Sequence, residues 1–188
     1  MVRIFWGSLL FHLLISLSVF GQLNLNLRSN LQYSQTLNDI WGYANGEDEY
    51  ALVGTVEGVS IVNISNPDSV YEVQYIPDAN STWRDIKTWD HYAYAVNETG
   101  AGLLIVDLDS LPFSIDTFRW TGAGTPINFT DAHNLFIDEN GFCYLVGGNT
   151  ANGGAKILDL NSNPTNPTLV GVYNLRSVHD VFVRAPFE

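Results

Sequence analysis

The chain has 188 residues and a formal net charge of −12, with 46% hydrophobic and only 15% charged residues. This composition is typical of a globular protein and excludes an intrinsically disordered chain, which combines few hydrophobic residues with many charges. The eight Lys and Arg residues are scattered, so we expect no nucleic-acid partner, because binding to a phosphate backbone needs clustered positive charge.

Residues 1–21 have the pattern of a secretory signal peptide. Arg3 precedes an apolar stretch at residues 4–20, and the small residue Gly21 ends it. A transmembrane anchor is the alternative, because the stretch is almost long enough to span a bilayer. Interspersed serines and a histidine disfavour the anchor. We therefore predict an exported protein, secreted or held at the cell surface, with no membrane span in the mature chain.

Short apolar segments recur from residue 39 onward and divide the chain into repeats. The predicted repeats open at Asp39, Asp85, Asn134 and Asp180, with spacings of 46, 49 and 46 residues. Three further runs follow in each of the first three repeats. The second run lies at 50–54, 92–96 and 143–147, and the third begins at Gly58, Gly102 and Gly154. The fourth lies at 70–76, 115–120 and 169–173. Runs of this length, rich in β-branched and aromatic residues and bounded by Gly, Pro, Asn and Asp, are typical of β-strands. Asn140-Gly141 predicts a hairpin turn in which both residues have positive φ.

Four strands in each repeat of 45–50 residues predict an all-β protein, a β-propeller of four-stranded antiparallel blades. The blades are expected at about 39–80, 85–125 and 134–175, with the start of a fourth at 180, inside a propeller domain at 22–188. Closed propellers have roughly four to eight blades, so about three blades make an incomplete ring. We interpret the sequence as the N-terminal part of a longer protein, with Leu31–Tyr33 as a candidate outer strand of the closing blade. Closure by oligomerisation is the alternative.

Two of the third strands, Leu104-Ile105-Val106-Asp107 and Ile157-Leu158-Asp159, resemble the LVIVD repeat. The stretch from His133 to Asp159 and the stretch Val178–Arg184 resemble the choice-of-anchor B family of secreted bacterial β-propeller proteins. This resemblance, which covers about residues 39–184, implies the fold and export. It implies no catalytic residues.

His133 and His179 occupy the same position of the repeat, directly before the residue that opens it, and the equivalent residues are Asn38 and Arg84. The first strand of a blade lines the central channel, so we expect these side chains at the channel mouth. One interpretation is a ligand site formed by Arg84, His133, His179 and Asp180, or a metal site, because imidazole is a good ligand for transition metals. The other interpretation is structural: each of these polar pairs hydrogen-bonds to a neighbouring blade. The regular repetition favours the structural interpretation.

Three other features bear on function. Asn63, Asp107 and Asp159 end the third strands and are predicted to form turns, because Asn and Asp hydrogen-bond to the backbone two residues on. Cys143 is the one cysteine, so no intrachain disulfide forms, and its apolar surroundings predict a buried, inert thiol. Trp83 and Trp89 flank a predicted loop where an indole face can stack on a sugar.

Two functions are compatible with these observations. The first is an exported or cell-surface module that binds an extracellular protein or a glycan, without a cofactor and without catalytic activity. The second is an extracellular enzyme or metal-binding protein with its site at the channel mouth. The sequence lacks a nucleophile elbow, a zinc-binding helix and a phosphate loop, and this favours the first function.

Overall fold

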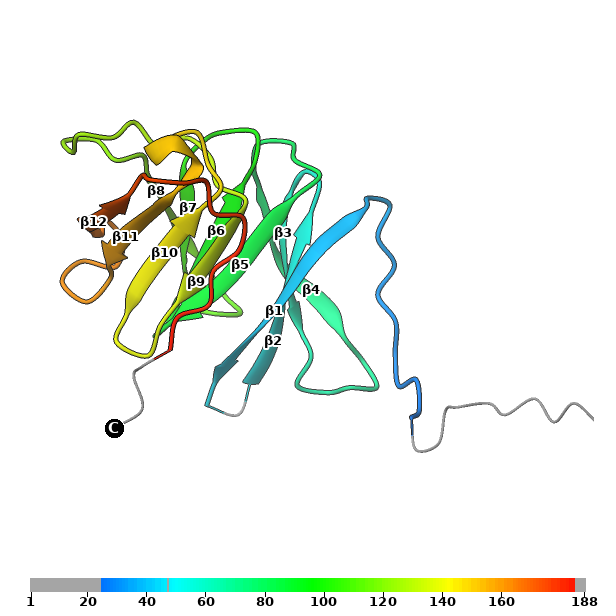
Figure 1. Ribbon diagram of the computed structural model, residues 1–188. Coiled ribbons are helices and arrows are strands. Elements are labelled where there is room, and N and C mark those ends of the chain that lie inside the picture. The colour runs from blue at the N-terminus through cyan, green and yellow to red at the C-terminus, as the bar shows by residue number, and fades with distance from the viewer. Residues whose placement is uncertain (1–24, 47, 185–188) are drawn as a thin grey trace, which may run out of the picture.

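The computed structural model describes residues 25–46 and 48–184, and within them the protein is all-β. The predicted signal peptide at 1–21 lies outside the described residues. Three four-stranded antiparallel sheets follow one another along the chain, each formed by four consecutive strands (Figure 1). One 3-10 turn, η1 (Ala151–Gly153), lies in the connection between the second and third strands of the third sheet. In the described part of the chain no helix has the length and hydropathy required to cross a membrane.

The strands fall where the repeat spacing predicts them. Blade 1 contains β1 (Leu37–Asn45), β2 (Asp48–Thr55), β3 (Gly58–Asn63) and β4 (Tyr71–Pro77). Blade 2 contains β5 (Arg84–Trp89), β6 (Tyr92–Asn97), β7 (Leu103–Asp107) and β8 (Asp116–Trp120), and blade 3 contains β9 (Asn134–Ile137), β10 (Phe142–Val146), β11 (Ala155–Asp159) and β12 (Thr168–Tyr173). The first strands β1, β5 and β9 are neighbours in space, and the three sheets do not close into a ring (Figure 1). The predicted all-β fold of an incomplete propeller is confirmed.

Two hydrophobic cores fill the spaces between successive blades, and blade 2 contributes to both. Successive side chains of a strand point to opposite faces of its sheet. In β7, Leu104 and Val106 therefore join the core against blade 1, while Leu103 and Ile105 join the core against blade 3. Burial on both faces requires a continuous apolar run instead of an alternating pattern. This explains the Leu-Leu-Ile-Val sequence that precedes Asp107.

Acidic residues at the start of the repeat connect the inner strands of successive blades. The carboxylate of Asp39 accepts a hydrogen bond from the backbone N–H of Ile86 at 2.7 Å, and that of Asp85 accepts one from Leu135 N–H at 2.8 Å. Each carboxylate thus satisfies a backbone donor of the next blade. At these two positions the residue that opens the repeat has the structural role considered from the sequence.

The β9–β10 hairpin forms, but its turn differs from the predicted one. The loop has four residues, Asp138 to Gly141, and only Gly141 has positive φ (77°), whereas Asn140 does not. The carboxylate of Asp138 accepts hydrogen bonds from the N–H groups of Asn140 and Phe142 at 2.9 and 3.0 Å. A longer loop that is held by an Asp side chain and ends in a left-handed Gly therefore replaces the two-residue turn.

The segment before β1 packs on blade 1 without forming a strand. Leu31 and Tyr33 cover Val53 and its neighbours on the face of blade 1 that is turned away from blade 2. The hydroxyls of Tyr33 and Ser60 are 2.9 Å apart. The segment therefore contacts blade 1 through side chains, and its role as the outer strand of a closing blade remains a prediction.

The segment after β12 approaches blade 3 at the positions used between the earlier blades. The ring of Phe182 meets that of Phe136 edge-on, with a centroid distance of 5.1 Å. Both residues lie two positions after a repeat opening, as do Trp41 and Lys87, whose ammonium lies 4.6 Å from the indole. Although residues 174–184 form no strand, Phe182 makes the contact that the repeat pattern requires.

Candidate functional site

The residues that end the third strands form turns, as predicted. Oδ1 of Asn63, Asp107 and Asp159 accepts a hydrogen bond from the backbone N–H two residues on, at 3.1, 3.0 and 2.9 Å. Asp159 also bonds to the side chain of Asn161, and these bonds hold the pKa of its carboxyl below the usual range. This repeated position therefore has a local structural role in all three blades.

Arg84 is not at an open channel mouth, in contrast to the expectation from its place in the repeat. Its side chain is buried, with 1% of the residue exposed. Its guanidinium donates to the carboxylate of Asp78 and to the carbonyl oxygens of Thr55, Val56 and Ala79. Arg84 thus joins the end of blade 1 to blade 2, and these hydrogen bonds occupy its guanidinium.

The position that Arg84 occupies in blade 2 is taken in blade 3 by His133, which lies in an aromatic and acidic environment. The imidazole stacks on Trp83, with ring centroids 4.6 Å apart and planes 8° apart, and the indole Nε1 donates to the carbonyl of His133 at 2.6 Å. Nδ1 of His133 lies 2.6 Å from Oε1 of Glu98, at the end of β6. His133 therefore hydrogen-bonds to the neighbouring blade.

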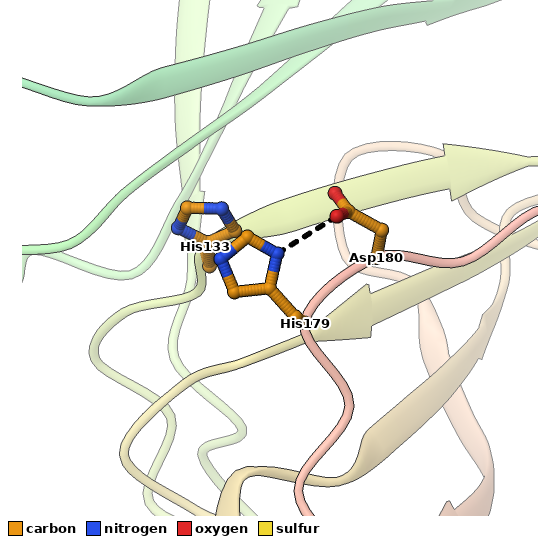
Figure 2. Close-up of side chains that lie close together, drawn as sticks. All are labelled: His133, His179 and Asp180. Atoms are coloured by element: carbon orange, nitrogen blue, oxygen red, sulfur yellow. Dashed lines mark hydrogen bonds and ion pairs between the residues drawn. The ribbon is translucent and has the colours of Figure 1, made fainter.

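His179 and Asp180 come next to His133, although they are far away in sequence. The two imidazole rings have centroids 3.9 Å apart at 45°, and Nδ1 of His179 lies 2.7 Å from a carboxylate oxygen of Asp180 (Figure 2). His133, His179 and Asp180 each offer one ligand atom, and these atoms all lie within 4.8 Å of one another. Three of the four predicted site residues are thus brought together, and Arg84 is not among their partners.

A second candidate site is a cleft of about 440 Å³ between blades 2 and 3, at the end of β5 opposite to His133. It is lined by Trp89, Asp90, Tyr92, Leu160, Asn161 and Pro164. Its walls are fixed by hydrogen bonds: the amide of Asn161 donates to Asn140 O at 2.9 Å, and Tyr94 OH donates to Pro164 O at 3.1 Å. Aromatic rings beside exposed amide and carboxylate groups, in a cavity of this size, are typical of a small-ligand pocket.

The two candidate sugar-stacking tryptophans do not form one site. Residues 84–89 are strand β5 and not a loop, so Trp83 and Trp89 lie at opposite ends of blade 2. Trp83 is covered on one face by His133, whereas Trp89 lies in the cleft. The sequence identified Trp89 but not its partners from blade 3, because these lie about 70 residues away along the chain.

Two buried groups complete the set of candidate reactive residues. Cys143 is fully buried, as predicted, and this burial raises the pKa of its thiol. Lys156 is also fully buried, its ammonium has no hydrogen-bond partner among the residues that the structure describes, and it lies 5.8 Å from the ring of Phe129. Burial lowers the pKa of Lys156, and the charge of Asp131 opposes this effect. In the sequence, the indication of this burial is that Lys156 lies inside a strand whose other residues from Ala155 to Leu158 are apolar.

We expect Lys156→Met to raise the free energy of unfolding at pH 7 by about 1–3 kcal/mol, because an unpaired buried polar group is removed without loss of volume. The pKa of Lys156 is lower in the folded protein, so above this pKa the unfolded chain binds more protons than the folded one. The destabilisation caused by the buried ammonium therefore decreases as pH rises towards the ordinary lysine pKa of about 10.4. Urea unfolding of the wild type and of Lys156→Met from pH 7 to pH 10 should show a difference in the free energy of unfolding that decreases as pH rises. A difference that stays constant with pH would contradict the role of the charge.

Comparison with known families identifies the repeat. Two stretches of the sequence, residues 47–76 and 141–175, match the LVIVD repeat. The first stretch includes β2, β3 and all of β4 except Pro77, and the second includes β10, β11 and β12. A search among curated proteins found no significant match. Membership of the choice-of-anchor B family remains a prediction.

Proposed function

We propose that this chain, a β-propeller-like protein that contains LVIVD repeats, is an exported or cell-surface module that binds glycans in the cleft between blades 2 and 3. The observation that carries the proposal is the composition of this cleft. Trp89 and Tyr92 provide aromatic surfaces on which the apolar face of a sugar ring packs. Asp90 and Asn161 provide acceptors and donors for the sugar hydroxyls.

Preorganisation of the cleft supports this function. Trp89 packs against the β9–β10 turn, where a Cβ on Gly141 would lie 2.6 Å from the indole. The rings of His91 and Tyr92 are in contact, with centroids 4.2 Å apart and planes tilted by 37°. Side chains that are held in place before binding lose little conformational entropy on binding, and this favours affinity for a weakly apolar ligand. The carboxylate of Asp90 is 72% exposed, and its contact with Nδ1 of His91 at 3.3 Å leaves it accessible to a sugar hydroxyl.

The test is an immobilised glycan array, followed by calorimetry with each glycan retained. We expect Trp89→Ala and Asp90→Ala to weaken binding at least tenfold, because each removes a group that contacts the ligand. Trp83→Ala is the matched control, since this indole lies at the other end of the blade, and it should bind as the wild type does. Equal binding by all three variants would exclude the cleft, and binding to a protein partner alone would exclude a glycan ligand.

The second candidate function is metal binding or catalysis at the mouth of the predicted channel. It is favoured by one observation, the convergence of His133, His179 and Asp180 from separate repeats. The structural interpretation of the same position accounts for the bond between His133 and Glu98. It does not account for the arrangement of the other two residues.

A further inference from the structure

The imidazole of His133 has one nitrogen that is held and one that has no partner. Nδ1 meets the carboxylate of Glu98 at 2.6 Å, and the ring stacks on Trp83 and contacts the tilted ring of His179. Only 13% of the side chain is exposed. Nε2 is buried and has no hydrogen-bond partner in the described protein. An unsatisfied buried polar atom of this kind costs about 1–3 kcal/mol, so its retention calls for a ligand.

The contact with Glu98 determines which nitrogen is available. A carboxylate accepts a hydrogen bond, so in the neutral ring the proton is on Nδ1 and Nε2 carries a free lone pair. Histidines that bind metals are commonly oriented in this way by a carboxylate on the other nitrogen. His133 is therefore a preoriented ligand, and Glu98 is its positioning residue.

His179 and Asp180 supply the other two ligand atoms. In a tetrahedral site with metal–ligand bonds of 2.0–2.2 Å, ligand atoms lie roughly 3.4 Å apart. The three ligand atoms here lie within 4.8 Å, and a small movement brings them into range. The side chains of His179 and Asp180 are 75% and 68% exposed, so they are free to make it.

The carboxylate of Asp180 lies beside the imidazole of its neighbour His179 and bonds to its Nδ1. The carboxylate of Asp180 faces the imidazole of His179, which lies beside that of His133 (Figure 2). An ion that entered the site would replace the hydrogen bond between Asp180 and His179 with two metal bonds.

We propose that His133, His179 and Asp180 bind a divalent transition-metal ion of the zinc class, with Glu98 orienting His133. This inference deepens the second candidate function by naming the ion, and it does not depend on the glycan cleft. Two imidazoles and one carboxylate favour a borderline ion over Ca²⁺ or Mg²⁺, which prefer an all-oxygen set. The two carboxylates balance the charge of the ion. Three protein ligands leave a fourth position for water or a ligand group.

The experiment is a titration of the chelator-treated protein with Co²⁺, followed by its visible absorption, with Zn²⁺ as competitor. We expect one ion per chain and a spectrum typical of four-coordinate Co²⁺, which Zn²⁺ abolishes. His133→Ala and His179→Ala should each weaken binding at least a hundredfold. His91→Ala is the matched control, because this histidine lies against Tyr92 and Asp90, away from the three proposed ligands. The Co²⁺ affinity of this variant should equal that of the wild type.

Glu98→Gln tests the positioning role separately. We expect Co²⁺ affinity to fall 10–100-fold while the absorption spectrum is kept, because the ligands remain and only the orientation of His133 is lost. An unchanged affinity would exclude this role for Glu98. Equal Co²⁺ binding by wild type, His133→Ala and His179→Ala, or no binding by the wild type, would overturn the metal site. Ligand binding that depends on His133 without Co²⁺ binding would leave a function at the mouth standing and overturn only the metal.

Discussion

Replacement of Arg84 by methionine is expected to lower the free energy of unfolding by about 3–5 kcal/mol, because it leaves the buried carboxylate of Asp78 without its nearest cation. The side chains of Arg84 and Asp78 are 0% and 1% exposed. The substitution also removes the donors for the backbone carbonyls of Thr55, Val56 and Ala79, which join the blades. Urea unfolding at pH 7 measures the loss.

Two further variants separate the ion pair from packing. Asp78→Asn combined with Arg84→Met should cost clearly less than the sum of the single changes, because the buried ion pair is removed as a unit and Arg119, the other partner of Asp78, is partly exposed to solvent. Arg28→Met removes the surface ion pair with Asp68, in which both side chains are more than half exposed, and it should change stability little. Strict additivity in the double variant, or an equal loss in Arg28→Met, would show that the buried pair has no special weight.

The same pair makes stability depend on acid. Burial acts to raise the pKa of Asp78, but the ion pairs with Arg119 and Arg84 outweigh it and hold the pKa below its ordinary value. A carboxyl with a lowered folded pKa stabilises the protein above the unfolded value of about 3.9 and loses this contribution as pH falls through the folded pKa. In Arg84→Met the acid transition should therefore move to higher pH.

Gly154→Ala is expected to destabilise the protein by about 3 kcal/mol, because there is no space for a methyl group. A Cβ at this position would lie 1.9 Å from the carbonyl oxygen of Tyr173, at the end of β12. The equivalent glycines show the same close approach: 2.0 Å from Ile76 O at Gly58 and 2.6 Å from Trp120 O at Gly102. Since the obstructing atom belongs to the backbone, relief requires the fourth strand to shift.

Gly42→Ala is the matched control for the glycine prediction. Gly42 also lies in a strand, β1, but a Cβ there meets nothing within 4 Å. Its substitution should change stability by less than about 1 kcal/mol, the span of intrinsic strand preferences. Thermal unfolding of both variants gives the comparison, and a Gly154→Ala protein as stable as Gly42→Ala would refute the steric explanation.

A glycine stands at the start of each third strand or directly before it, and the reason for this recurrence is visible only in the folded protein. Its recurrence at 58, 102 and 154 marked the repeat, and the composition of the strands identified them as β. The reason for glycine was hidden in the sequence, because the carbonyl that it approaches belongs to the fourth strand, about 18 residues later. The Asn and Asp residues that end the same strands were predictable, since their turns are formed within three residues.

The strands, the four-strand repeat and the local turns were predictable from the sequence, because each depends on short-range periodicity and on backbone preferences of nearby residues. The roles of the polar residues at the repeat openings depend instead on contacts that form only in the folded protein. Arg84 and His133 occupy one repeat position, yet the first is a buried structural cation and the second faces His179 and Asp180. Arg84 meets the carbonyls of Thr55 and Val56, 29 and 28 positions earlier, and His133 meets Trp83, 50 positions earlier. Such long-range contacts leave no periodic trace in the sequence.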